Sequence, residues 1–110
     1  MADWTLAVSW GRLQAQGRAR VSLPGLELAL FLIDGEVHAI EDACPHAGAS
    51  LCRGPLNGLR VQCPAHGLRF DLRTGAMPGG GLQLKVFPSR IVGDEVQVRL
   101  GPDIPSPTVL

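Results

Sequence analysis

The sequence predicts an all-β fold in which antiparallel strands form a sandwich or a small barrel. Two segments each show a pair of apolar, strand-like stretches on either side of a Gly/Asp turn, which is typical of β-hairpins. The 110 residues include 14 glycines and 9 prolines, a composition that indicates many turns and few long helices. The hydrophobic fraction of 45% suits one globular domain with a small core.

The first hairpin is expected in the N-terminal half of the chain. Residues 26–33, which are largely apolar, and residues 36–40 flank Asp34-Gly35, a dipeptide that favours a tight turn. Glu27 interrupts the first of these stretches, which predicts a buried strand and is too short to span a membrane. Residues 18–23 alternate between polar and apolar side chains and predict a half-buried strand before this hairpin.

The second hairpin is expected near the C-terminus. Residues 89–92 and 95–100 flank Gly93-Asp94, and the second stretch alternates with apolar residues at every other position. Only residues 6–14 offer a pattern for a short helical turn. Residues 101–110 predict an extended tail, either without a role or used in binding a partner.

The charge and cysteine content narrow the functional classes. The formal net charge is zero, which does not favour nucleic acid or a membrane surface as a partner. The N-terminal residues show no secretory signal pattern, so the cytoplasm is the expected location. Three cysteines make a disulfide framework an unattractive explanation and favour a metal or redox role.

The region between the two hairpins, residues 44–81, has a different composition. It is rich in glycine and proline and contains all three cysteines and two of the three histidines. Because its apolar content is too low for a core of its own, a metal centre is the expected source of order.

Two short motifs in this region carry the chemistry. Cys44-Pro45-His46 and Cys63-Pro64-Ala65-His66 each combine one thiolate ligand with one imidazole ligand. Two thiolates and two imidazoles suit either a tetrahedral zinc ion or an iron–sulfur cluster. With one ligand of each kind in both motifs, a two-iron centre would place the cysteines on one iron and the histidines on the other.

The two motifs and their surroundings resemble the Rieske family. The resemblance rests on CPHAGASL at 44–51, CPAHGLRFD at 63–71 and Thr74-Gly75, and it extends over nearly the whole chain. It implies one Rieske-type 2Fe–2S cluster on Cys44, His46, Cys63 and His66, with both histidines near the surface. It also implies a Rieske-type antiparallel β sandwich at 1–100, with a small two-loop cluster-binding subdomain at about 43–81.

Four positions depart from the high-potential members of this family. Ala49 and Ala65 stand where those members have a cysteine pair joined by a disulfide. Leu68 and Phe70 stand where those members have a Ser and a Tyr that donate hydrogen bonds to the cluster. Such hydrogen bonds stabilise the more negative reduced state, so their loss predicts a reduction potential nearer roughly −150 mV than +300 mV.

The resemblance implies an electron-transfer protein and not an enzyme. It is closest to ferredoxins that pass single electrons from a flavin-containing reductase to the oxygenase of a ring-hydroxylating system. The alternative is the small subunit of a nitrite reductase, whose large subunit would accept the electron, and a zinc-binding structural module is a remote third reading. A catalytic oxygenase subunit would need a mononuclear iron domain, for which the chain is too short. A monomer is expected.

Other conspicuous residues have simpler interpretations. His38 lies in a predicted strand and is expected to be structural or exposed, and Trp4 and Trp10 are expected to pack in the core or at its edge. Cys52 is expected to be a small buried hydrophobic residue, with a regulatory thiol as the alternative. Pro78 and the glycines at 79–81 fall where the family places a loop that covers the cluster, but the spacing is shortened here.

The charge of residues 44–81 differs from that of the remainder. Four arginines against Asp71 give this region a charge of +3, and the rest of the chain carries −3. A basic surface near the cluster would favour an acidic partner face, and scattered solvated side chains are the alternative. The four arginines are Arg53, Arg60, Arg69 and Arg73.

Overall fold

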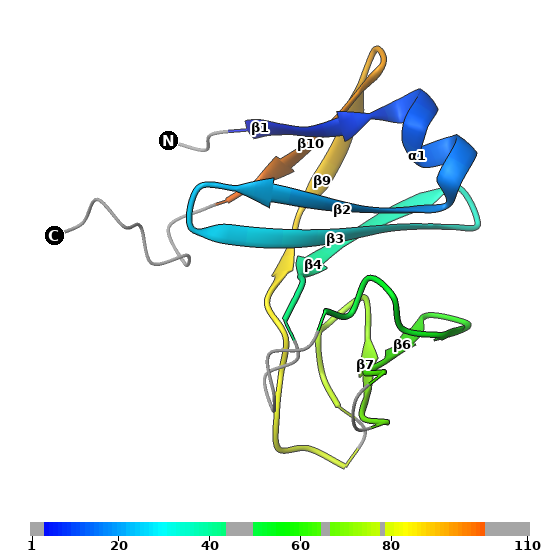
Figure 1. Ribbon diagram of the computed structural model, residues 1–110, viewed down its shortest axis with the longest axis vertical. Helices are drawn as coiled ribbons and strands as arrows, with labels where there is room; N and C mark the ends of the chain where they lie inside the picture. The colour runs from blue at the N-terminus through cyan, green and yellow to red at the C-terminus, as the bar shows by residue number, and fades with distance from the viewer. Residues whose placement is uncertain (1–3, 44–49, 65–66, 78, 101–110) are drawn as a thin grey trace, which may run out of the picture.

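The computed structural model describes residues 4–43, 50–64, 67–77 and 79–100. In these ranges the chain forms three antiparallel sheets and one short helix (Figure 1). The all-β prediction is therefore confirmed. No helix in the described ranges is long and apolar enough to cross a membrane.

The first sheet joins the two ends of the described chain. Its strand order is β1 (Trp4–Ser9), β10 (Glu95–Arg99) and β9 (Ser89–Val92). The hairpin between β9 and β10 has the predicted turn, with Gly93 at a φ of 60°. Because glycine has no Cβ atom, it adopts this left-handed backbone conformation at little energetic cost.

The second sheet forms the middle of the molecule (Figure 1). Its order is β2 (Arg18–Leu23), β3 (Leu26–Ile33), β4 (Glu36–Glu41) and β8 (Val86–Phe87). The predicted turn between β3 and β4 is confirmed, because Asp34 and Gly35 have φ values of 52° and 80°. Two successive positive φ values match the hairpin turn whose twist suits the flanking strands.

The third sheet is small and belongs to the glycine-rich region. It consists of β5 (Leu56–Asn57), β6 (Arg60–Gln62) and β7 (Arg69–Asp71) in that order. Beyond β7, an isolated bridge joins Ala76 and Gln83. The three glycines at 79–81, next to Pro78 outside the described residues, all have positive φ.

The helical prediction for residues 6–14 is wrong in its boundaries. Strand β1 continues through Ser9, and the helix α1 covers Trp10–Gln16. Pairing with β10 holds residues 6–9 in the extended conformation, so tertiary contacts override the local pattern there. Ser9 accepts a hydrogen bond from the Arg12 backbone and caps the helix, which ends at Gly17 with a φ of 77°.

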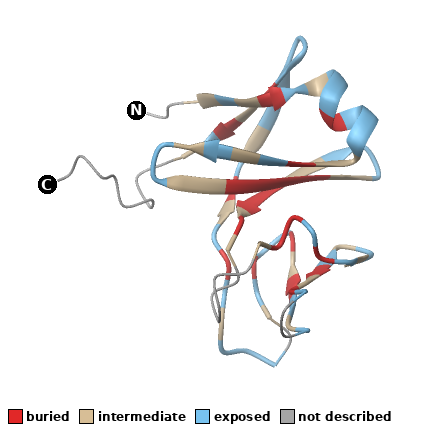
Figure 2. Ribbon diagram, in the orientation of Figure 1, coloured by how far each residue is buried: buried red, intermediate tan, exposed pale blue. Residues whose placement is uncertain are grey.

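Strand β3 separates two hydrophobic cores (Figure 2). Leu28 and Leu30 point into the core shared with the first sheet and α1, whereas Ala29 and Phe31 point into the core shared with the third sheet. Burial on both faces explains why β3 is a continuous apolar run without alternation. The middle sheet is therefore the support on which the glycine-rich region rests.

Candidate metal centre

The second ligand segment lies between β6 and β7, and hydrogen bonds join its described residues. The backbone N–H of Cys63 donates to the carbonyl of Leu68 at 2.7 Å, and the N–H of Gly67 donates to the carbonyl of Cys63 at 2.9 Å. Gly67 has a φ of 75°, which favours glycine at this position. These bonds fix the backbone on which Cys63 sits.

Cys63 is completely buried in the core between the middle and third sheets. Its neighbours in that core include Val61, Phe70 and Leu72, which are also fully buried. A thiolate ligand held in an apolar, water-excluding environment suits a metal–sulfur centre, whose potential depends on burial and hydrogen bonding. The described part of the site therefore fits an iron–sulfur cluster.

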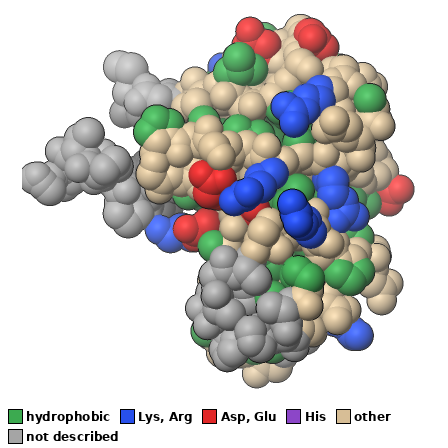
Figure 3. Space-filling model, in the orientation of Figure 1, with side chains coloured by type: hydrophobic (Ala, Val, Ile, Leu, Met, Phe, Trp, Pro, Cys, Tyr) green, Lys and Arg blue, Asp and Glu red, His purple; other side chains and the backbone are tan. Residues whose placement is uncertain are grey.

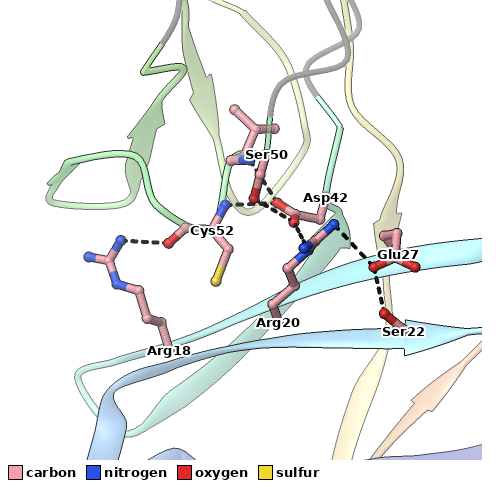
Figure 4. Close-up of polar contacts among 8 residues, drawn as sticks. Arg18, Arg20, Ser22, Glu27, Asp42, Ser50 and Cys52 are labelled. Atoms are coloured by element: carbon pink, nitrogen blue, oxygen red, sulfur yellow. Dashed lines mark hydrogen bonds and ion pairs between the residues drawn. The ribbon is translucent and has the colours of Figure 1, made fainter.

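The first ligand segment is held at both ends by Asp42. This carboxylate accepts hydrogen bonds from the Ser50 hydroxyl at 2.7 Å and from the backbone N–H groups of Leu51 at 2.7 Å and Cys52 at 2.8 Å (Figure 4). Asp42 precedes Cys44 by two residues, and Ser50 follows Ala49. The bonds therefore bring together the two described ends of the segment that contains Cys44 and His46.

The two ligand segments are connected through the residues that follow the first. The N–H of Gln62, the residue before Cys63, donates to the carbonyl of Pro55 at 2.9 Å. Leu51 and Cys63 are both fully buried in the same core. The structure thus brings the chain after the first motif against the chain before the second.

Of the four predicted ligands, Cys63 lies within the described residues. Cys44, His46 and His66 lie outside them, as do Ala49, Ala65 and the tail at 101–110. The set of four therefore stays a prediction, as do the expected surface position of the histidines and the boundaries of the cluster-binding subdomain.

Leu68 and Phe70, on which the predicted reduction potential depends, lie in the β6–β7 region with Cys63. Phe70 is completely buried, and Leu68 is half-buried and packs against the same core. Neither side chain has a hydrogen-bond donor. The low reduction potential stays a prediction.

Cys52 is buried in the core, as expected for a small hydrophobic residue, with 7% of its surface exposed. Burial raises the pKa of its thiol, and the nearby Asp42 carboxylate raises this pKa further against the opposing effect of three arginines. A thiol kept protonated in this way is a weak nucleophile. The arrangement favours the packing role over a regulatory one.

The structure also describes Trp4, Trp10 and His38. The Arg90 guanidinium lies over the Trp4 ring at 4.3 Å from its centroid, and Trp10 packs against the core of the first sheet. His38 is half-buried on β4, and its Nε2 atom is enclosed without a hydrogen-bond partner among the described residues. The expected packing of Trp10 at the edge of the core is confirmed.

The arginines of the glycine-rich region lie at its surface. Arg60 and Arg69 are exposed and line a shallow depression with Gly67, Leu68 and Met77, close to the second ligand segment. Arg73 instead pairs with Asp71, at 2.9 Å between Nη2 and Oδ2. This ion pair lowers the pKa of Asp71 to about 2.

Sequence reasoning missed three residues of this site, namely Asp42, Arg18 and Arg20. Arg20 contacts Asp42, and Arg18 donates to the backbone of the segment that follows the first motif. The position of Asp42 just before the Cys-Pro-His motif was a signal in the sequence. Nothing in the sequence indicated that two arginines of β2 would reach this segment.

Comparison with known proteins identifies the family. Residues 3–87 match the Rieske [2Fe-2S] domain. The chain belongs to the Rieske family. Its cofactor is accordingly one Rieske-type 2Fe–2S cluster, which replaces the zinc alternative.

This Rieske protein is similar over most of its length to ferredoxin components of dioxygenase systems. It is 34% identical over 99 residues to the ferredoxin component of the naphthalene 1,2-dioxygenase system of Pseudomonas aeruginosa, covering 88% of this chain and 95% of the relative. It is 41% identical over 87 residues to the ferredoxin component of the p-cumate 2,3-dioxygenase system of Pseudomonas putida, covering 74% and 73% of the two chains.

Solved structures show the same Rieske fold. The ferredoxin of carbazole 1,9a-dioxygenase from Nocardioides aromaticivorans IC177 matches with a TM-score of 0.77 and 27% identity, covering 86% of this chain and 95% of that one. A protein described as an NADH-dependent nitrite reductase small subunit from Mycobacterium tuberculosis matches with a TM-score of 0.79 and 28% identity, covering 90% and 96%. The predicted Rieske-type fold is confirmed.

Proposed function

We propose that this protein is a low-potential Rieske ferredoxin that carries single electrons to the oxygenase of a multicomponent ring-hydroxylating system. The observation that carries the proposal is the match to a dioxygenase ferredoxin component over 95% of that relative's length. By contrast, a terminal oxygenase of carbazole 1,9a-dioxygenase is covered over only 31% of its chain. This protein therefore corresponds to nearly the whole of a ferredoxin component but to only one part of a catalytic oxygenase.

The ligand set proposed for the cluster is Cys44, His46, Cys63 and His66. When bound, the cluster supplies reversible one-electron chemistry. The protein's own part is to present Cys63 directly after β6 and to exclude water with the core around Val61 and Phe70. No substrate site is required for this role.

The visible and electron paramagnetic resonance spectra test the ligand set. His46→Ser and His66→Ser are expected to abolish or alter the Rieske spectrum, because each removes an imidazole from one iron. Cys52→Ala is the matched control, since it alters a third cysteine of the same region without touching the proposed ligands. An unchanged spectrum in either histidine variant would show that the ligand set is wrong.

The partners proposed are a flavin-containing reductase as donor and an oxygenase as acceptor, with the ferredoxin acting as a monomer in the cytoplasm. The exposed Arg60 and Arg69 next to the second ligand segment support docking onto an acidic partner face. Association between opposite charges weakens as salt screens them.

Electron-transfer kinetics test this docking. We expect the second-order rate of oxygenase reduction to fall with rising ionic strength, and Arg60→Gln and Arg69→Gln to flatten that dependence. Arg12→Gln, on the exposed face of α1, is the control with the same charge change. A rate that does not vary with ionic strength would exclude electrostatic steering.

A second candidate function is that of a nitrite reductase small subunit. The structural match to the M. tuberculosis protein, with a TM-score of 0.79, supports it. Purification from the native host separates the two functions. A carrier elutes as a free monomer, whereas a subunit elutes with a large partner that has nitrite reductase activity.

A further inference from the structure

We propose that Asp42, held by Arg20, is a positioning residue for the cluster: it clamps the two ends of the first ligand segment and ties them to β2. This inference rests on the proposed ligand set, in which that segment supplies Cys44 and His46. Asp42 is not itself proposed as a ligand of the cluster. It acts through the backbone on either side of Cys44 and His46.

The Asp42 side chain is completely buried, yet each oxygen has two partners. Oδ1 accepts from the backbone N–H groups of Leu51 and Cys52, and Oδ2 accepts from the Ser50 hydroxyl and lies 3.0 Å from Nε of Arg20. Burying a carboxylate is costly unless such partners replace its hydration. Because charge-assisted hydrogen bonds are stronger than neutral ones, this group holds the segment ends firmly.

Arg20 is itself held in place by β3. Its Nη2 atom lies 3.3 Å from Oε1 of Glu27, and the Ser22 hydroxyl donates to the same Glu27 oxygen at 2.7 Å (Figure 4). The carbonyl of Glu27 also accepts from the backbone N–H of Asp42 at 2.8 Å. Asp42 is thus connected to β3 through its backbone and to β2 through its carboxylate.

Arg18 adds a second attachment from the same strand. Its Nη1 atom donates to the carbonyl oxygens of Cys52 at 2.9 Å and Gly54 at 2.7 Å, and its guanidinium lies 5.4 Å from the Phe31 ring centroid. Arg18 and Arg20 are two residues apart on β2 and therefore lie on one face of the strand. Figure 3 shows Lys and Arg side chains gathered over this junction between the middle sheet and the glycine-rich region.

The position of the Asp42 hydrogen bonds, at the two ends of the first ligand segment, points to a role beyond general stability. The hydrogen bonds of Asp42 join residue 42 to residues 50–52, which flank the segment that contains Cys44 and His46 of the proposed ligand set. Correct ligand geometry requires support from residues around the ligands. Loss of the clamp should therefore release the cluster at temperatures at which the β-sheets remain folded.

The test measures cluster loss and cluster spectroscopy in the loaded protein, well below the unfolding temperature. Asp42→Ala removes all four interactions, Asp42→Asn keeps an oxygen for Leu51 and Cys52, and Arg20→Gln removes only the outer partner. We expect bleaching by an iron chelator to accelerate about tenfold or more in Asp42→Ala and less in the other two. The visible circular dichroism should change in the same order.

Leu13→Ala is the control, because Leu13 is completely buried in the other core. It should lower the unfolding temperature and leave the bleaching rate and the spectrum unchanged. If Asp42→Ala fails to fold, Asp42→Asn and Arg20→Gln still decide the matter. Equal bleaching rates in wild type, Asp42→Asn and Arg20→Gln would overturn the proposal.

The opposite charge changes in Asp42→Asn and Arg20→Gln distinguish a positioning role from a purely electrostatic effect on the cluster. Asp42→Asn removes a negative charge and Arg20→Gln a positive one, so a pure field effect would shift the reduction potential in opposite directions without faster bleaching. That result would overturn the positioning role. An unchanged spectrum in His46→Ser would instead overturn the ligand set, and this inference with it.

Discussion

The α-carbon of Gly54 lies so close to the backbone oxygen of Gln62 that a Cβ atom on Gly54 would overlap that oxygen. Gly54 is buried just after the first ligand segment, and Gln62 immediately precedes Cys63. This contact therefore joins the backbones that carry the two motifs. The close approach is possible because glycine has no side chain.

We expect Gly54→Ala to destabilise the protein by about 1–3 kcal/mol or more, because the backbone of one segment must move to admit a methyl group. Cluster binding should weaken with it. Thermal unfolding and chelator bleaching measure the two effects. The control is Gly11→Ala in α1, where a Cβ would meet only the Asp94 carboxylate at 3.7 Å. A Gly54→Ala protein as stable as Gly11→Ala would contradict the prediction.

The Asp71–Arg73 pair predicts a pH-dependent contribution to stability. The side-chain hydrogen bond from Arg73 lowers the pKa of Asp71 from 3.8 to about 2. A carboxylate whose pKa is lowered by folding stabilises the protein above its unfolded pKa and loses that contribution as the pH falls through the folded one. The contribution should thus be complete near neutral pH and disappear between about pH 4 and pH 2.

Urea unfolding of wild type and Arg73→Gln, measured from pH 7 downward, tests this. The difference in unfolding free energy at pH 7 should be below about 1 kcal/mol, because the Arg73 side chain is largely exposed to solvent. It should shrink as the pH approaches 3. A difference that grows on acidification would have the wrong sign for this mechanism.

The buried Cys52 thiol should be inert in the folded protein. Since burial raises its pKa, little thiolate forms near neutral pH, and alkylation by iodoacetamide should be slow until the protein is unfolded. Mass spectrometry of the labelled peptide measures this. Rapid labelling of Cys52 in protein that retains its full visible spectrum would point to a reactive, regulatory thiol.

Substitutions at Leu68 and Phe70 test the expected low potential. The wild-type midpoint should lie near roughly −150 mV. Leu68→Ser and Phe70→Tyr should raise it, because each introduces a hydroxyl that can donate a hydrogen bond and stabilise the reduced cluster. A redox titration followed by electron paramagnetic resonance measures the midpoint.

Leu68→Ala and Phe70→Leu serve as controls that alter the packing without adding a donor. If these variants raise the midpoint as much as the hydroxyl variants do, solvent access and not hydrogen bonding controls the potential.

Local signals in the sequence were sufficient for several features. The turns at Asp34-Gly35 and Gly93-Asp94 and the strands beside them depend on neighbouring residues, so their pattern was readable directly. The Cys-Pro-His and Cys-Pro-Ala-His motifs indicated the family and its cluster for the same reason. The helix was misplaced because pairing of β1 with β10, a contact between the two ends of the described chain, kept residues 6–9 extended.

Only the tertiary structure decided how the site is supported. Arg18 reaches the carbonyls of Cys52 and Gly54 across 34 and 36 residues of sequence, and such contacts leave no periodic pattern. The burial of Asp42 and the two cores on either side of β3 likewise depend on how the sheets stack. The sequence by itself determined the hairpins, the two motifs and the family, because these are set by adjacent residues. The packing of distant strands decided which charged side chains hold the first ligand segment in place.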